Sequence, residues 1–149
     1  QHQLFAAWVR RNEDRFRNVL QDGERLVGEW LAQAHGTKYA LDELEPFGVF
    51  DIMVGQERLP FNDFVKRVDA TFARPHMLHD GAAISVDAVM ELHERHHWPC
   101  EETEGVVYRI ERQGVVEFLA KFVKPSKVDG KYLSEVSGQP EVWNWQPTW

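Results

Sequence analysis

The residues best suited to chemistry lie in the last third of the chain, where basic side chains gather on a predicted hairpin. Between residues 109 and 131 there are six basic residues and three acidic ones, so this stretch is net +3 in a chain of net charge −7. Local positive charge in an acidic protein suits an anionic ligand such as a polyphosphate. An edge hairpin kept soluble by lysines would give the same pattern, so charge alone leaves both interpretations open.

Two other predicted strands carry acidic residues among apolar ones. Glu29 lies in the apolar-rich run 24–31, where a buried carboxylate needs a partner or a ligand unless it reaches solvent at the strand end. Asp51 follows Phe50 within the β-branched and aromatic run 46–54. An aromatic ring at Phe50 suits either the core or, through its π face, stacking on a nucleobase.

A histidine-rich segment is a weaker candidate for a metal site. His93 and His97 are four residues apart, which places them on one helix face at a spacing that a metal accepts. His96 is adjacent to His97, however, and Cys100 lies beyond Pro99, where the helix has stopped. Basic side chains near a helix C-terminus also interact favourably with the helix dipole without any metal.

The elements that must position these residues follow from hydrophobic periodicity and turn signals. Helices are expected over residues 4–20, 59–72 and 86–97, and strands over residues 24–31, 46–54, 104–111 and 115–124. Ser85 is a suitable N-cap for the third helix, and Arg112-Gln113-Gly114 is a tight turn between the last two strands. Because this hairpin is antiparallel, we expect an α+β fold of mostly antiparallel sheets with flanking helices.

Length and composition bound the class of protein. A chain of 149 residues with 43% hydrophobic residues suits one globular domain with one core. A single cysteine excludes an internal disulfide and favours a reducing compartment, so we expect the cytoplasm. No apolar run reaches the roughly 20 residues of a membrane span. The chain begins with Gln1 and its methionines lie only at 53, 77 and 90, so we expect a fragment or a processed product.

Four segments, taken in order, resemble the adenylation domain of ATP-dependent RNA ligases. They look like motifs III, IIIa, IV and V of that nucleotidyltransferase family, and each is weak alone. In chain order they are Leu26-Val27-Gly28-Glu29-Trp30, Phe47-Gly48-Val49-Phe50-Asp51-Ile52, Glu104-Gly105-Val106-Val107-Tyr108-Arg109 and Leu119-Ala120-Lys121-Phe122-Val123-Lys124. The resemblance covers roughly residues 24–131 and implies an incomplete, ATP-grasp-like nucleotidyltransferase domain.

The resemblance also implies roles for single residues, with ATP and Mg²⁺ (or Mn²⁺) as cofactors. Glu29 would bind the ribose of ATP, and Phe50 would stack on the adenine with Asp51 beside it. Glu104 would help to hold the metal ion as part of the catalytic set. Lys121 would contact the α-phosphate and stabilise charge as pyrophosphate leaves, which is the usual contribution of a lysine to such transfers.

The first departure from the family concerns its nucleophile, which lies in a Lys-x-Asp-Gly motif upstream of motif III. Nothing before Glu24 matches, because the first lysine of the chain is Lys38. The one match is Lys127-Val128-Asp129-Gly130, which follows motif V. It is either an ordinary Asp-Gly turn after the hairpin or a permuted nucleophile.

The second departure concerns the lysine pair of motif V, which many relatives space as Lys-x-Lys on one strand face. Here Lys121 and Lys124 are three residues apart, so regular alternation puts them on opposite faces. A bulge near Pro125 would bring Lys124 onto the same strand face as Lys121. The role of Lys124 in catalysis therefore depends on the local backbone.

Two hypotheses follow. In the first, residues 1–149 are the central and C-terminal part of one RNA ligase domain that seals RNA ends and has its own N-terminal segment as a partner. In the second, the chain is a non-catalytic nucleotide- or RNA-binding module of the same fold, with DNA ligases and capping enzymes as sibling possibilities. The tail at Trp143-Asn144-Trp145 is expected to pack against the domain, with a base-stacking platform as the alternative.

Overall fold

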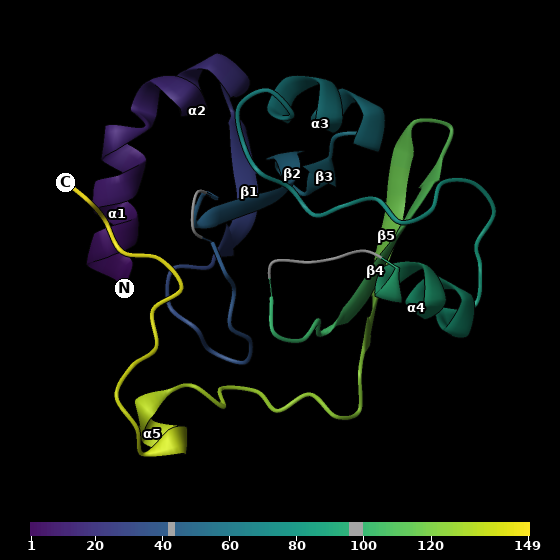
Figure 1. The fold of residues 1–149 in the computed structure, drawn as a ribbon. Coiled ribbons are helices and arrows are strands. Elements are labelled where there is room, and N and C mark those ends of the chain that lie inside the picture. Colours follow the sequence, from purple (N-terminus) through teal and green to yellow (C-terminus); the bar gives the residue numbers. More distant parts are fainter. Residues whose placement is uncertain (42–43, 96–99) are drawn as a thin grey trace.

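Two antiparallel sheets and five helices form the fold of the described residues, 1–41, 44–95 and 100–149, in this computed structural model (Figure 1). The helices are α1 (His2–Arg11), α2 (Glu13–Val19), α3 (Phe61–Val68), α4 (Val86–Glu94) and α5 (Ser134–Ser137). The strands are β1 (Glu24–Trp30), β2 (Phe47–Val54), β3 (Glu57–Arg58), β4 (Gly105–Arg112) and β5 (Val115–Val123). The first sheet has the order β1-β2-β3 and the second is the β4-β5 hairpin. The predicted α+β class is confirmed.

The first predicted helix is divided into α1 and α2 at Asn12. The Asn12 side-chain amide donates to the backbone oxygen of Trp8 at 2.8 Å, and its oxygen accepts from Arg15 at 2.9 Å. Asparagine competes with the backbone in this way, which favours a helix end over a helix interior. The expectation of one continuous helix was therefore wrong at a single polar residue.

The other helices are shorter than predicted. Pro60 lies immediately before α3 and cannot donate a backbone hydrogen bond, so it fits at a helix start and not within one. Ser85 caps α4 as expected, and its hydroxyl accepts from the backbone nitrogen of Ala88 at 3.2 Å. The predicted end of that helix, at residues 96 and 97, lies outside the described residues.

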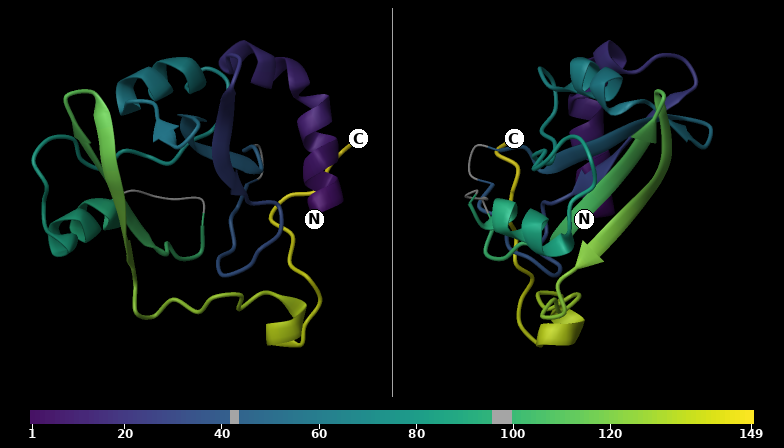
Figure 2. Two further views of the ribbon diagram at one scale, coloured as in Figure 1. Left: turned by 180° about the vertical axis from the view of Figure 1, so that it is seen from behind. Right: turned by 90° about the vertical axis from the view of Figure 1, so that its right-hand side faces the viewer.

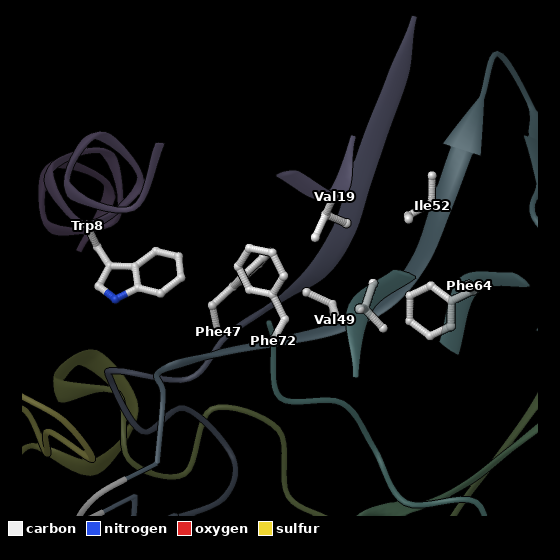
Figure 3. Close-up of a cluster of buried hydrophobic side chains, with 8 residues drawn as sticks. Trp8, Val19, Phe47, Val49, Ile52, Phe64 and Phe72 are labelled. Atoms are coloured by element: carbon white, nitrogen blue, oxygen red, sulfur yellow. The ribbon is translucent and has the colours of Figure 1, made fainter. Parts of the chain in front are cut away.

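The main core lies between the first sheet and helices α1, α2 and α3 (Figure 3). Its fully enclosed members are aromatic or branched: Trp8, Val19, Phe47, Val49, Ile52, Phe64, Val68 and Phe72. Burial of such side chains stabilises the fold by about 1.5–3 kcal/mol each. This packing fixes the first sheet, and therefore the strand that carries Glu29.

A β-bulge in β2 decides which side chains leave this core. Val27 pairs with Asp51 but Gly28 pairs with Val49, so Phe50 is the extra residue. Val49 and Ile52 are both fully buried in the same core, although strict alternation would place them on opposite faces. The bulge therefore directs both Phe50 and Asp51 away from the core.

The β4-β5 hairpin is joined by a two-residue turn at Gln113-Gly114, and Arg112 belongs to β4. Both turn residues have positive φ, at 51° and 76°, as a type I′ turn requires. One hairpin face meets α4, and the Tyr108 hydroxyl donates to the backbone oxygen of Ile84 at 3.3 Å.

After β5 the chain runs through α5 and returns to α1 as a tail, residues 138–149, which both views in Figure 2 follow. Trp145 packs on Trp30 with ring centroids 5.9 Å apart, and Trp143 forms an isolated bridge with Gln33. The tail packs on the domain as the sequence predicts. No helix within the described ranges is long and apolar enough to cross a membrane.

Candidate functional site

A small cavity lies between the end of β1, the segment that follows it and the start of β4. We call the segment 31–41 the pocket loop. The cavity measures about 40 Å³ and is lined by Glu29, Trp30, Leu31, Gln33, His35, Gly36, Thr37, Tyr39 and Glu104. A larger open hollow of about 290 Å³ lies between Leu4, Trp143, Gln146 and Pro147, but no ionisable side chain lines it. The smaller cavity is therefore the candidate site.

Glu104 is the centre of the charged cluster at this cavity. Its carboxylate forms an ion pair with Lys127 and lies 3.8 Å from the Lys121 ammonium. Lys127 also donates to the hydroxyl of Thr37 at 3.0 Å, and only 8% of its side chain is exposed. Burial raises the pKa of Glu104, but the hydrogen bond and charge of Lys127, together with Lys121, outweigh burial and lower it.

Close backbone approaches position this cluster. Gly105, at the start of β4, lies so near the backbone oxygen of Phe122 that a Cβ atom would overlap it. At Gly36 a Cβ would overlap the ammonium end of Lys127. Glycine at these two positions lets the hairpin, the pocket loop and Lys127 meet at Glu104.

Glu29 lies at the same cavity, on the opposite face of β1 from the core. Its side chain is accessible to solvent and makes no hydrogen bond or ion pair among the described residues. Partial desolvation raises the pKa of Glu29, and the negative charge of Glu104 raises it further, while Lys121 and Lys127 act against this. A carboxylate without a protein partner is well suited to accept hydrogen bonds from a ligand.

Lys121, within β5, and Lys124, just after it, separate as strand alternation predicts. Lys121 faces Glu104, whereas the Lys124 ammonium lies 3.5 Å from the hydroxyl of Thr103. Thr103 in turn contacts His93 on α4. The structure therefore brings Lys127, and not Lys124, to Glu104. The motif at Lys127 marked this position in the sequence, although the turn interpretation also holds because Gly130 has a φ of 68°.

Phe50 and Asp51 have different surroundings despite being neighbours. Phe50 is 38% exposed, as stacking on a ligand requires. The Asp51 carboxylate is 3% exposed and accepts from Arg58 at 2.9 Å and from Arg109. Arg109 belongs to β4 and also donates to the backbone oxygen of Leu59, so Asp51 links the two sheets.

The predicted basic stretch is largely neutralised. Five of its six basic residues have a carboxylate within ion-pair distance. The pairs are Arg109 with Asp51 and Glu111, Arg112 with Glu117, Lys121 and Lys127 with Glu104, and Lys131 with Glu101. The positive charge near the cavity is therefore organised around one carboxylate rather than spread over a surface.

The histidine alternative receives no support from the described part of the chain. His96 and His97 lie outside it, and the described residues contain no group of three His, Cys, Asp or Glu side chains that could hold a metal ion. His93 is buried and contacts Thr103. Burial raises the pKa of the Cys100 thiol, which disfavours the thiolate that binds metals.

Fold and site together define an α+β protein with two carboxylates and two lysines around a loop-lined cavity. A family model described as RNA ligase matches residues 1–123, a stretch that includes Glu29, Phe50, Glu104 and Lys121. The chain belongs to the RNA ligase family. No curated protein and no solved structure gives a significant match.

Proposed function

We propose that this chain is the nucleotide-binding part of an ATP-dependent RNA ligase, an adenylation domain of the nucleotidyltransferase type. The observation that supports this most directly is the meeting of Glu104, Lys121 and Lys127 beside the unpartnered carboxylate of Glu29. Nucleotidyl transfer depends mainly on positioning and on neutralising phosphate charge, and these side chains offer both.

The side chains at the cavity, together with Phe50, which is not among the residues that line it, fit different parts of ATP. Glu29 accepts hydrogen bonds from the ribose hydroxyls, and Phe50 stacks on the adenine. Lys121 and Lys127 contact the phosphates, with Lys127 in the place that the sequence suggested for Lys124. Because the cavity measures about 40 Å³ while ligand pockets usually exceed 300 Å³, the cavity must widen when ATP enters.

Asp51 acts through its neighbours in this proposal. Its carboxylate is occupied by Arg58 and Arg109, so it has little capacity left for a nucleotide. It holds β4 against β2, and it fixes the bulge that exposes Phe50. Asp51 is therefore a positioning residue for the adenine site.

The carboxylates also fit a divalent cation. Mg²⁺ is commonly bound by one or two carboxylates together with substrate phosphates, and Glu104 and Glu29 line the same cavity. Mg²⁺ or Mn²⁺ there would neutralise phosphate charge. Lys121 and Lys127 would then contact the phosphates as well as Glu104.

The partners follow from the same proposal. In the first step a lysine amine attacks the α-phosphorus of ATP and loses a proton, so that a P–N bond forms and pyrophosphate leaves. The AMP then passes from the lysine to the RNA 5′-phosphate. In the last step an RNA 3′-hydroxyl attacks that 5′-phosphate and AMP leaves. We infer that the lysine that attacks ATP lies in an upstream segment of the same domain. That segment and the RNA ends are therefore the partners of this chain.

The free thiol of Cys100 is in keeping with a reducing cytoplasm.

ATP binding tests the site directly. Equilibrium dialysis with labelled ATP and Mg²⁺ should show binding, and Glu104→Gln, Lys121→Ala and Lys127→Ala should each weaken it by about 10- to 100-fold, as expected for contacts to charged groups. Lys124→Ala should weaken it far less, and Lys66→Ala, on an exposed face of α3, should leave it unchanged. Equal effects of Lys124→Ala and Lys127→Ala would contradict the assignment.

Ligation separates an enzyme from a binding module. The chain should not become covalently labelled by ATP, but it should seal an RNA whose 5′-phosphate already carries AMP to an RNA 3′-hydroxyl. ATP binding without sealing would favour the non-catalytic module. Covalent label on Lys127 would instead identify a permuted nucleophile, and sealing of DNA acceptors alone would indicate a DNA ligase.

A further inference from the structure

The pocket loop is held in place by the tail, which lies beyond the family-matched residues 1–123. The Ala34 nitrogen donates to the backbone oxygen of Val142 at 2.9 Å. The nitrogens of Asn144 and Trp145 both donate to the backbone oxygen of Ala32, at 2.8 and 3.1 Å. Ala32 and Ala34 are fully buried, and the tail is hydrogen-bonded to the backbone of both.

The Asn144 carboxamide connects the two ends of this loop. Its nitrogen donates to the backbone oxygen of Leu31 at 2.8 Å, and its oxygen accepts from the backbone nitrogen of Tyr39 at 3.0 Å. One side chain thus bonds to a backbone acceptor at the start of the loop and to a backbone donor near its end. Between these two points lie Gly36 and Thr37, which contact Lys127.

Other backbone contacts also hold the loop. Among the described residues they join Leu31 to Pro46, His35 to Tyr132 and Lys38 to Glu101, and there are bridges between Gln33 and Trp143 and between Tyr39 and Cys100. Loops that make few regular hydrogen bonds open more readily than strands do. Loss of the Asn144 side chain would therefore loosen the loop at Leu31 and Tyr39, the two residues that it joins.

We propose that Asn144 is a positioning residue that keeps the pocket loop in the conformation that forms the nucleotide site. It touches no ligand itself. It acts through Leu31 and Tyr39, which hold Thr37 beside Lys127 and Glu104. The predicted effect on ATP rests on the proposed function, whereas the effect on the loop does not.

Hydrogen exchange measured by mass spectrometry tests the loop without nucleotide. In Asn144→Ala, exchange in residues 31–41 should become at least tenfold faster, while exchange in β2 and α3 should not change. Gln146→Ala is the matched control. It removes an exposed carboxamide from the same tail, and this carboxamide makes no hydrogen bond within the described residues. Unchanged exchange at residues 31–41 in Asn144→Ala would overturn the proposal.

Affinity for ATP distinguishes positioning from general loss of stability. Asn144→Ala should raise the Kd for ATP with Mg²⁺ by roughly tenfold, in line with two lost hydrogen bonds. Val19→Ala lies in the core away from the cavity, so it should lower the Tm but leave this Kd unchanged. A faster-exchanging loop with an unchanged Kd would contradict the positioning role.

The two proposals can fail separately. If the wild-type chain binds no ATP, the proposed nucleotide site is wrong, and the exchange rates still decide whether Asn144 holds the loop. If the wild-type chain binds ATP and Asn144→Ala matches it in both measurements, the inference about Asn144 is wrong and the nucleotide site remains.

Discussion

At the scale of single residues, this protein uses its carboxylates in three ways. Glu29 lies at the cavity and has no hydrogen-bond or ion-pair partner among the described residues, so it is available to a ligand. Glu104 is shared by two lysines. Asp51 is buried and fully engaged with arginines. Sequence patterns marked Glu29 and Asp51 as acidic residues in apolar strands, and the family resemblance marked Glu104, but only their surroundings distinguish a binding group from a structural one.

The structural role of Asp51 predicts a large loss of stability when its charge is removed. Asp51→Asn leaves Arg58 without a carboxylate among the described residues, and it leaves Arg109, which is 15% exposed, paired with Glu111 alone. Breaking a buried ion pair on one side typically costs about 3–5 kcal/mol. Urea denaturation followed by circular dichroism would measure this loss of unfolding free energy.

The control for this measurement is Asp63→Asn, because the Asp63–Lys66 pair is exposed and 3.7 Å long. Exposed pairs of this kind contribute about 0–1 kcal/mol. Similar losses of unfolding free energy in the two variants would show that Asp51 does not link the sheets.

At the scale of elements, hydrophobic periodicity located most of the fold. Strands β1, β2, β4 and β5 and helices α3 and α4 lie within one to four residues of their predicted ends, where the described residues allow comparison. The pattern missed β3 and α5, which are two and four residues long and carry too little periodic signal. It also missed the bulge at Phe50, because the pairing partner decides where a strand gains a residue.

The pairing of β1 with β2 predicts opposite outcomes at two glycines on neighbouring strands, Gly28 and Gly48. A Cβ at Gly28 would lie 2.5 Å from the backbone oxygen of Gly48 and 2.7 Å from the Phe47 ring. Gly28→Ala should therefore destabilise the protein by about 1–3 kcal/mol, as overpacking does. A Cβ at Gly48 would meet only the Leu31 side chain, at 3.8 Å, so Gly48→Ala should be tolerated. Thermal unfolding of the two variants would test this, and a Tm for Gly28→Ala as high as that of Gly48→Ala would contradict it.

At the scale of the whole molecule, the candidate site combines segments that lie far apart in the chain. Glu29, Thr37, Glu104 and Lys127 come from four different segments, and the pocket loop looks polar and irregular in the sequence. A motif can indicate the type of chemistry, but it cannot show that Lys127 replaces Lys124 beside Glu104. That outcome depends on where the chain turns after Pro125, which strand alternation does not determine.

A second long-range contact predicts how global stability depends on pH. Glu24, at the start of β1, accepts two hydrogen bonds from Arg67 of α3, one of them 2.7 Å long. This contact lowers the pKa of Glu24 below its ordinary value of 4.5. A carboxyl with a lowered folded-state pKa stabilises the fold above its unfolded pKa and loses that contribution as the pH falls through the folded value.

The matching measurement compares wild type with Glu24→Gln by urea denaturation between pH 7 and pH 3. Wild type should be more stable at pH 7 by about 1–3 kcal/mol, and the difference should shrink in the acid range. Glu29, whose pKa is raised, is present in both proteins, so its opposite effect cancels. Glu13→Gln, which removes an exposed pair with Arg17, should show almost no difference at any pH, and a constant offset for Glu24→Gln would refute the linkage.

The bridge made by Asn144 also has a consequence for the order of events during synthesis. Its partners Leu31 and Tyr39 precede it by 113 and 105 residues, so the ribosome must release residue 144 before the loop can close. The aromatic core needs only residues up to Phe72 for its enclosed members, and it can form earlier. A nascent chain of this protein should therefore pass through a stage with a packed first sheet and an unfastened pocket loop, and the candidate site should take its final form only after the tail has emerged.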